Sequence, residues 1–236
     1  MGKGSTVYFD PMEIPFLTGD EDVDADLKET AINYTLGIFR LIVAGLEGQL
    51  TKWEDSVIST AIKRVYEQVG VTEEPETWER SKGLTVSMVY EEVVNIVETR
   101  EFMDDATENI KHRAAMEVME SCRVYFEEGE AKSSTFKNPM SINELYDAKL
   151  IIFSFGMRGA TNSQIDPVIL ALKQLSVANI SIQISNYCKY VRKCFNVKVW
   201  EEYQRWGNAA GSAEIIGNAM TGGRNNKQSC SYIRWK

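Results

Sequence analysis

The chain has 236 residues and a mass of 26.7 kDa, and 44% of its residues are hydrophobic and 25% are charged. This balance is typical of a soluble globular protein with a substantial core. It excludes a disordered chain, a collagen-like repeat and a small disulfide scaffold.

Charge is distributed unevenly along the chain. Residues 1–130 carry 28 acidic and 12 basic side chains, a net charge of −16, whereas residues 131–236 carry 6 acidic and 14 basic ones, a net charge of +8. The acidic part disfavours nucleic acid as its partner, while the basic part can face phosphate groups.

The residues that commonly bind metals are few. One histidine, His112, is present, and the four cysteines show no CxxC spacing: Cys122, Cys188, Cys194 and Cys230. We therefore expect no zinc site, and we expect reduced thiols as in a cytosolic protein.

Neither export nor membrane insertion is expected. Met1 is followed by Gly-Lys-Gly-Ser, without the apolar region of a signal peptide. The most apolar stretch, 165–184, is interrupted by Asp166, Lys173 and several amide side chains, which makes it too polar to span a bilayer. The sequence therefore predicts a cytoplasmic protein without a transmembrane segment.

The first part of the chain predicts one short strand followed by helices. Residues 5–9 are rich in β-branched and aromatic side chains and end at Asp10-Pro11, which is typical of a short strand stopped by proline. Apolar positions then recur at helical spacing in four segments, 25–46, 51–70, 85–97 and 107–128.

Two further features refine this helical region. Thr51 is followed three residues later by Glu54, the capping-box pattern at the start of a helix. Residues 71–83 contain Pro75, Gly83 and four glutamates, and we expect them to form a surface loop.

After residue 129 the pattern changes to alternating strands and helices. Residues 148–155 and 197–200 are short apolar runs, typical of strands buried on both faces of a parallel sheet. A long helix is predicted at 167–195, with Pro167 in its first turn, and a short helix at 212–220. A helix between two buried strands is the βαβ pattern, so both strands are expected in one parallel sheet.

Two adjacent carboxylates, Glu201 and Glu202, follow the second of these strands. Ligands bind at the carboxyl edge of parallel sheets, and a nucleotide hydrolase needs one acidic residue near magnesium and another to polarise the attacking water. The alternative is that two solvated glutamates begin a helix at Tyr203, where the helix dipole favours negative charge.

A phosphate-binding loop is missing from the sequence, because GxxxxGK[ST] occurs nowhere in it. Residues 2–6 contain similar residue types, but they precede a strand and so cannot present a helix N-terminus to phosphate.

Arg224 and Asp10 are two further candidate site residues. Arg224 follows Thr221-Gly222-Gly223 and can reach phosphate from a glycine-rich turn; the alternative is a helix C-cap followed by a solvated arginine. Asp10 ends the first predicted strand at a sheet edge, but an Asp-Pro turn needs no function.

Several short motifs together resemble the ATPases of type IV secretion and conjugative transfer, the VirB/TraC-like class of P-loop NTPases. Residues 7–11 resemble the strand and Asp-Pro that follow the P-loop helix in that family. Residues 50–62 are similar to its helical subdomain, 138–155 to its return to the core sheet, and 197–202 to its Walker B strand.

The resemblance implies roles for three residues. Glu201 takes the acidic position that holds Mg²⁺ through water, Glu202 is the catalytic carboxylate, and Arg224 lies near the nucleotide of an adjacent subunit. The implied cofactors are ATP and Mg²⁺. The implied partners are further copies in a homo-oligomeric ring, components of the secretion or conjugation channel, and DNA as a candidate substrate. The implied location is the cytoplasm, at the inner face of the cell membrane.

The expected fold is α/β, a partial RecA-like parallel sheet with a large all-α helical insertion. The expected segments are a first core strand and loop at 1–24, a helical subdomain at 25–130, and a core segment with the Walker B-like strand at 131–236. In that family the P-loop would precede residue 1, and a later strand with a polar sensor residue would follow residue 224. Residues 225–236 match nothing in the family.

Two functions follow from these observations. The first is the central part of a transfer ATPase, which by itself hydrolyses little ATP because the phosphate cradle is missing. The alternative is a non-catalytic protein-interaction module whose acidic helical face binds a basic partner.

Overall fold

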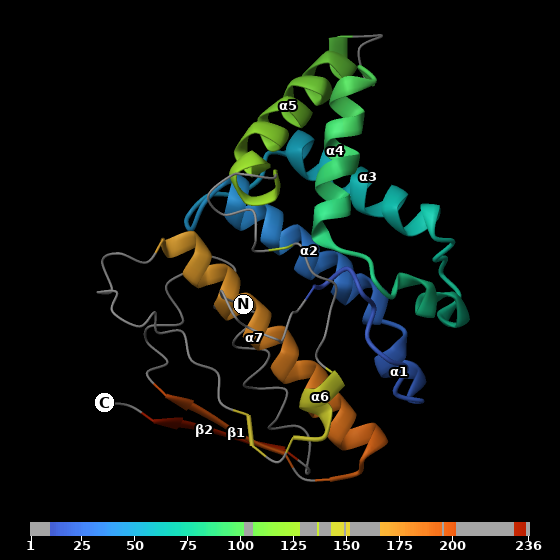
Figure 1. Cartoon of the computed structure of the whole chain (residues 1–236), viewed down its shortest axis with the longest axis vertical. Coiled ribbons are helices and arrows are strands. Elements are labelled where there is room, and N and C mark those ends of the chain that lie inside the picture. Colours follow the sequence, from blue (N-terminus) through green and yellow to red (C-terminus); the bar gives the residue numbers. More distant parts are fainter. Residues whose placement is uncertain are drawn as a thin grey trace. The chain divides into compact units, whose positions relative to one another are not determined.

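The computed structural model of the chain describes residues 10–101, 106–127, 136, 143–148, 150–151, 166–194, 196–201 and 229–234 (Figure 1). The last two segments are described by their backbone alone. The chain divides into two units, one formed by Met1–Phe16 with Ala25–Met140, and one by Leu17–Asp24 with Ser141–Lys236. The three segments expected from the sequence stay a prediction.

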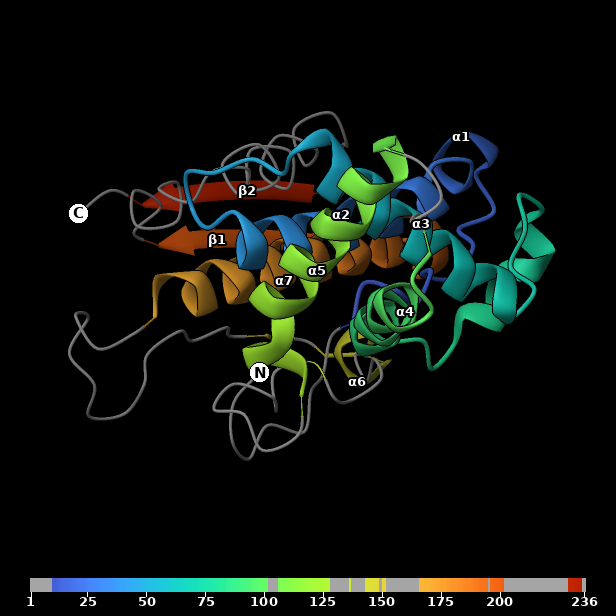
Figure 2. The same cartoon turned by 90° about the horizontal axis from the view of Figure 1, so that it is seen from above.

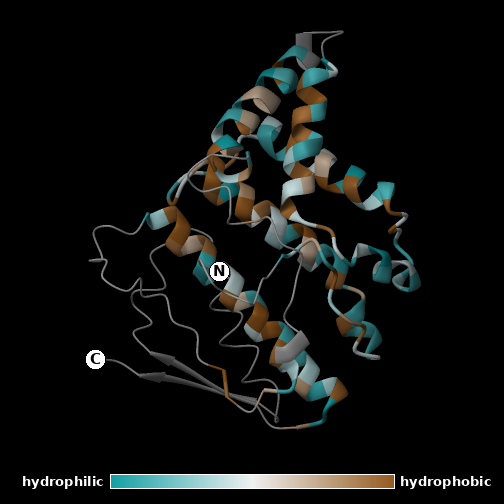
Figure 3. Ribbon diagram, viewed as in Figure 1, coloured by the Kyte–Doolittle hydropathy of each residue, from teal (hydrophilic) through white to brown (hydrophobic). Residues whose placement is uncertain are grey.

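The first unit is helical in its described part. Its α-helices are α2 (Leu27–Val43), α3 (Lys52–Gln68), α4 (Val86–Glu98) and α5 (Ala106–Phe126). Helix α3 packs against α2, α4 and α5, and α5 also contacts α2 and α4. Apolar stripes along these helices alternate with polar ones (Figure 3), and the apolar positions supply a shared core. The four predicted helices are therefore confirmed, with ends that differ by a few residues.

Local sequence signals explain where α3 begins and ends. The Thr51 hydroxyl accepts the backbone N–H of Glu54, and the Glu54 carboxylate accepts the backbone N–H of Thr51, so the predicted capping box is confirmed. The helix ends before Gly70, which has a φ of 76°, a conformation that favours glycine.

An aromatic cluster fills one end of the helical core. The rings of Phe39 on α2 and Tyr90 on α4 both stack on Phe126, with centroids 5.8 and 5.1 Å away, and Phe136 stacks on Phe126 at 5.2 Å. This packing ties three helices together through one side chain.

The expected surface loop at 71–83 is partly wrong. Residues Pro75–Ser81 form a 3₁₀ helix, η1, with the Trp78 side chain only 4% exposed. The Trp78 indole N–H donates to the carbonyl oxygen of Thr72 at 3.0 Å. The polar composition of the segment predicted a surface loop, but the buried Trp78 side chain anchors the segment to the core.

The second unit contains helices and one pair of strands. Its described elements are α1 (Glu21–Asp24), α6 (Asn143–Tyr146), α7 (Pro167–Asn186), the π-helix η3 (Tyr187–Val191), β1 (Asn196–Glu201) and β2 (Ser229–Arg234). The carboxylate of Asp166 accepts the N–H of Val168 at 2.8 Å, and Pro167 is in the first turn of α7 as predicted.

Helix α7 is apolar around most of its circumference and buries polar amides as well. Gln174, Asn179 and Gln183 are at most 5% exposed, and the Gln183 amide N–H donates to the Asn179 side-chain oxygen at 2.9 Å. The Tyr146 hydroxyl of α6 donates to the side-chain oxygen of Gln183 at 3.2 Å. These hydrogen bonds satisfy amide groups that burial would otherwise penalise.

Pro167–Val191 is one candidate membrane span within the described ranges, by length and composition, with a mean hydropathy of 1.4 in its most apolar window. In that window 56% of the residues are buried, and a core helix of a soluble protein has the same features. The absence of a transmembrane segment stays a prediction.

The fold class expected from the sequence is wrong. The structure is mainly α-helical, and in the described ranges the only strands are β1 and β2, which lie side by side and parallel in both views (Figures 1 and 2). The strand expected at 197–200 is present within β1. It was expected in one parallel sheet with 148–155, but its described partner is 229–234, with Val197 opposite Cys230.

The strand expected at 148–155 is described at three positions only, and 149 and 152–155 lie outside the described residues. At its described positions, 148, 150 and 151, the backbone is not a strand, and Leu150 is 77% exposed. A short apolar run has no helical or strand periodicity of its own, so only its neighbours decide its structure. The expected strand at 5–9 and helix at 212–220 lie outside the described residues.

Candidate functional site

The predicted nucleotide site is described at one position only. Glu201 is the last residue of β1, opposite Arg234 of β2 in the register of the strand pair. Glu202 and Arg224 lie outside the described residues, so the grouping of these three residues stays a prediction. In the described ranges, no three His, Cys, Asp or Glu side chains are grouped so that they could hold a metal ion. The positions predicted for Mg²⁺ and ATP stay predictions.

Asp10 has a role that differs from the predicted sheet edge. Its side chain is 1% exposed, and its two carboxylate oxygens accept the N–H of Val86, the first residue of α4, at 3.1 and 2.9 Å. One oxygen also accepts the N–H of Met12 at 3.0 Å. The N-cap residue Thr85 makes no side-chain hydrogen bond to the helix, so Asp10 caps α4 from a distant part of the sequence.

Burial dominates the electrostatics of Asp10. Loss of water around the carboxylate raises the pKa of Asp10 to about 7, although the hydrogen bonds from Val86 and Met12 act to lower it. The negative charge of Glu13 adds to the increase. The phenol of Tyr66 lies close by and donates to the Met12 carbonyl at 3.0 Å, which fixes the segment that carries Asp10.

A second charged cluster joins α3, α4 and the segment after α4. The Arg64 guanidinium donates to Glu92 at 3.1 Å and to both carboxylate oxygens of Glu101 at 3.0 and 2.7 Å. These hydrogen bonds raise the pKa of Arg64 and lower the pKa of Glu101, so this pair stays charged at neutral pH. The cluster is an ion pair network that fixes helix packing.

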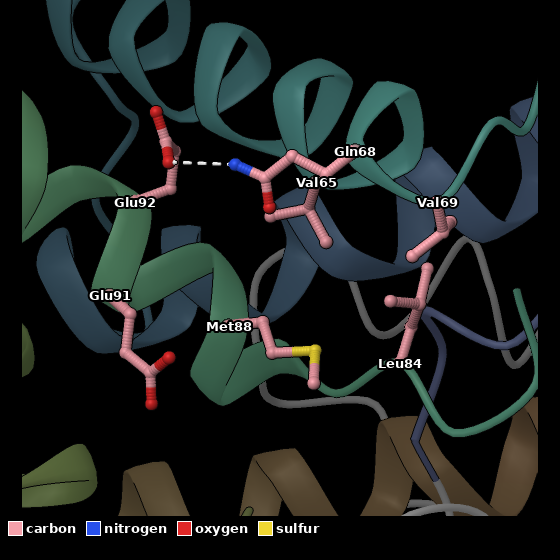
Figure 4. A pocket seen from close by; sticks show the side chains of 7 residues that line it. All are labelled: Val65, Gln68, Val69, Leu84, Met88, Glu91 and Glu92. Atoms are coloured by element: carbon pink, nitrogen blue, oxygen red, sulfur yellow. Dashed lines mark hydrogen bonds between the residues drawn. The ribbon is translucent and has the colours of Figure 1, made fainter.

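A pocket of about 300 Å³ lies beside this network, between α3 and α4 (Figure 4). Its lining residues come from the end of α3 and the residue after it, from the first half of α4, and from the residue before Thr85: Val65, Gln68, Val69, Leu84, Met88, Glu91 and Glu92. The side chain of Met88 points toward Leu84, whereas Glu91 extends away from the apolar side chains. We call this pocket the α3–α4 groove.

The α3–α4 groove has a buried apolar floor and a partly exposed rim. Val65 and Leu84 are 2% and 4% exposed, while Val69 and Met88 are 36% and 39% exposed. Glu92 is neutralised by Arg64 and accepts the Gln68 amide N–H at 3.2 Å. This arrangement suits binding of an apolar group, and it offers no nucleophile with an adjacent base.

Sequence reasoning missed both the ion pair network and the groove. Arg64 and Glu92 are 28 residues apart, and Asp10 and Val86 are 76 residues apart. The only local signal was the i,i+4 spacing of Arg64 and Gln68, which places both side chains on one face of α3.

Comparison of the chain with protein-family models, with curated proteins and with solved structures finds no match.

Proposed function

We propose that this chain is part of an ATPase that powers the transfer of DNA or protein through a type IV secretion or conjugation apparatus. The observation that supports it best is the strand β1, which belongs to a parallel pair and ends on Glu201, the first of two adjacent carboxylates. The short motifs at 7–11, 50–62 and 197–202 support the same proposal. With a mainly helical structure, the chain supplies chiefly the helical portion of such an enzyme.

In this proposal the chain by itself hydrolyses little or no ATP. Glu201 and Glu202 would act on Mg²⁺ and on the attacking water, and Arg224 on the nucleotide of a neighbouring copy. The chain has no GxxxxGK[ST] motif to hold the β- and γ-phosphates. Since phosphoryl transfer depends on positioning and charge stabilisation, its loss removes most of the catalysis.

Two measurements test this proposal. The coding DNA upstream of Met1 should encode, in frame, a strand followed by GxxxxGK[ST] and a helix; a promoter there with no such motif in any frame would contradict the proposal. In an ATPase assay the chain should show no turnover above the Glu202→Gln variant. Turnover that this substitution abolishes would refute the argument about the missing phosphate cradle.

A second candidate is a non-catalytic interaction module. It is supported by the net charge of −16 in residues 1–130 and by the self-contained helical packing of α2 to α5. Under this function, calorimetry should detect no binding of ATP to the native chain, and none to the Glu201→Ala and Arg224→Ala variants. Nucleotide binding that either substitution weakens would favour the ATPase instead.

A further inference from the structure

The α3–α4 groove combines apolar surface with one uncompensated negative charge. Val69 and Met88 together present the exposed part of the apolar rim, above the buried Val65 and Leu84. Such a small apolar surface bordered by polar side chains is a common feature of sites that receive a side chain from another protein.

The two glutamates of the groove differ in their partners. The Glu92 side chain is 9% exposed and its carboxylate lies 3.1 Å from the Arg64 guanidinium, so its charge is already balanced. Glu91 is exposed, and within the described part of the chain it forms no ion pair. Glu91 therefore remains available to a cation at the edge of the groove.

The charge around the groove defines the chemistry of its occupant. With a net charge of −16 over residues 1–130, the helical unit repels nucleic acids and anionic lipid surfaces and attracts cationic segments. The volume of about 300 Å³ is at the lower end of the range for small-molecule sites, and few polar groups converge on it. A protein side chain fits these features better than a polar metabolite.

We propose that the α3–α4 groove binds a segment of a partner protein in which an aliphatic side chain lies beside a lysine or arginine. The aliphatic side chain covers Met88, Val69 and Leu84, and the cation pairs with Glu91. This inference rests on the second candidate function, the interaction module, and gives it a site. It does not depend on ATP binding or hydrolysis.

The test uses the full chain and a fluorescein-labelled peptide built from leucine and lysine at helical spacing. We expect saturable binding by fluorescence anisotropy, weakened by added salt. Two control peptides, with glutamate in place of lysine or with serine in place of leucine, should not bind. Hydrogen exchange of the native chain should slow at the end of α3 and the start of α4 when the leucine-lysine peptide is added.

Matched variants separate the groove from general attraction to an acidic surface. Met88→Ser should weaken binding about fivefold and Glu91→Lys about tenfold, from the loss of part of an apolar contact and the reversal of one charge. The control variants Met116→Ser and Glu117→Lys change a methionine and a glutamate on α5 that are exposed as well, and they should leave binding unchanged.

Three results would overturn the proposal. They are the absence of saturable binding, equal binding of the serine-lysine peptide, and equal losses in the α4 and α5 variants. The ATPase proposal would be unaffected by any of them, because its own measurements concern upstream DNA and turnover. Circular dichroism of each variant confirms that the helices have formed.

Discussion

Asp10 gives the sharpest test of how this helical unit is held together. Its buried carboxylate caps α4 through two contacts with the N–H of Val86 and also holds Met12. The Asp10→Asn substitution keeps an oxygen that can accept these hydrogen bonds but removes the charge and its titration. Comparing the two proteins across pH therefore isolates the free energy linked to the proton on Asp10.

The structure determines the sign and size of the effect. The pKa of Asp10 is raised from 3.8 to about 7 in the folded protein, so folding favours the protonated form. The stability linked to that proton is fully present below pH 3.8 and is lost as the pH rises through 7. Between pH 5 and pH 8 the loss amounts to about 3 kcal/mol in the free energy of unfolding.

The assay is urea unfolding of both proteins at several pH values from 5 to 8, followed by circular dichroism. All other titrating groups are shared, so we expect the native chain to lose about 3 kcal/mol relative to the Asp10→Asn variant over this range. A difference that stays constant with pH would refute the raised pKa. If the N–H donors outweighed burial, the pKa of Asp10 would lie at or below 3.8, and the difference between the two proteins would likewise stay constant over this range.

Three further predictions concern the same helices. Arg64→Gln leaves the buried Glu92 without its cation and should lower the free energy of unfolding, measured by urea titration, by about 2 kcal/mol. The control Lys63→Gln, at an exposed side chain of the same helix, should change this free energy by less than about 0.5 kcal/mol. Equal effects of the two substitutions would contradict the role of the network. Thr51→Ala removes the capping box and should cost about 1 kcal/mol in thermal unfolding, and an unchanged midpoint would show that the cap is redundant. Burial raises the pKa of the Cys122 thiol, so a thiol reagent should label Cys122 only when the chain is unfolded. Labelling of Cys122 in the native protein at the rate of a free thiol would contradict its burial.

Helices in this protein are encoded locally. The capping box at Thr51 and Glu54, Pro167 at the start of α7 and the helical periodicity of α2 to α5 each depend on residues a few positions apart. Such signals act before any tertiary contact forms, and the sequence therefore predicts the helices and their approximate ends.

Strand pairing could not be predicted in the same way. The residues at 197–200 do form part of a strand, but its partner is 229–234, in a tail that matched nothing expected. The apolar run at 148–155 looked equally suited to a strand, and Leu150 within it is exposed. Main-chain hydrogen bonds between strands join residues far apart in sequence, so the composition of one run does not reveal its partner.

The sequence by itself thus determined a helical, acidic first part, the helix caps and the absence of a GxxxxGK[ST] motif. Only the tertiary structure placed Asp10 at the start of α4, joined Arg64 to Glu92 and Glu101, and formed the α3–α4 groove. The physical reason is that burial, pKa and ion pairing depend on groups brought together by packing from distant parts of the chain.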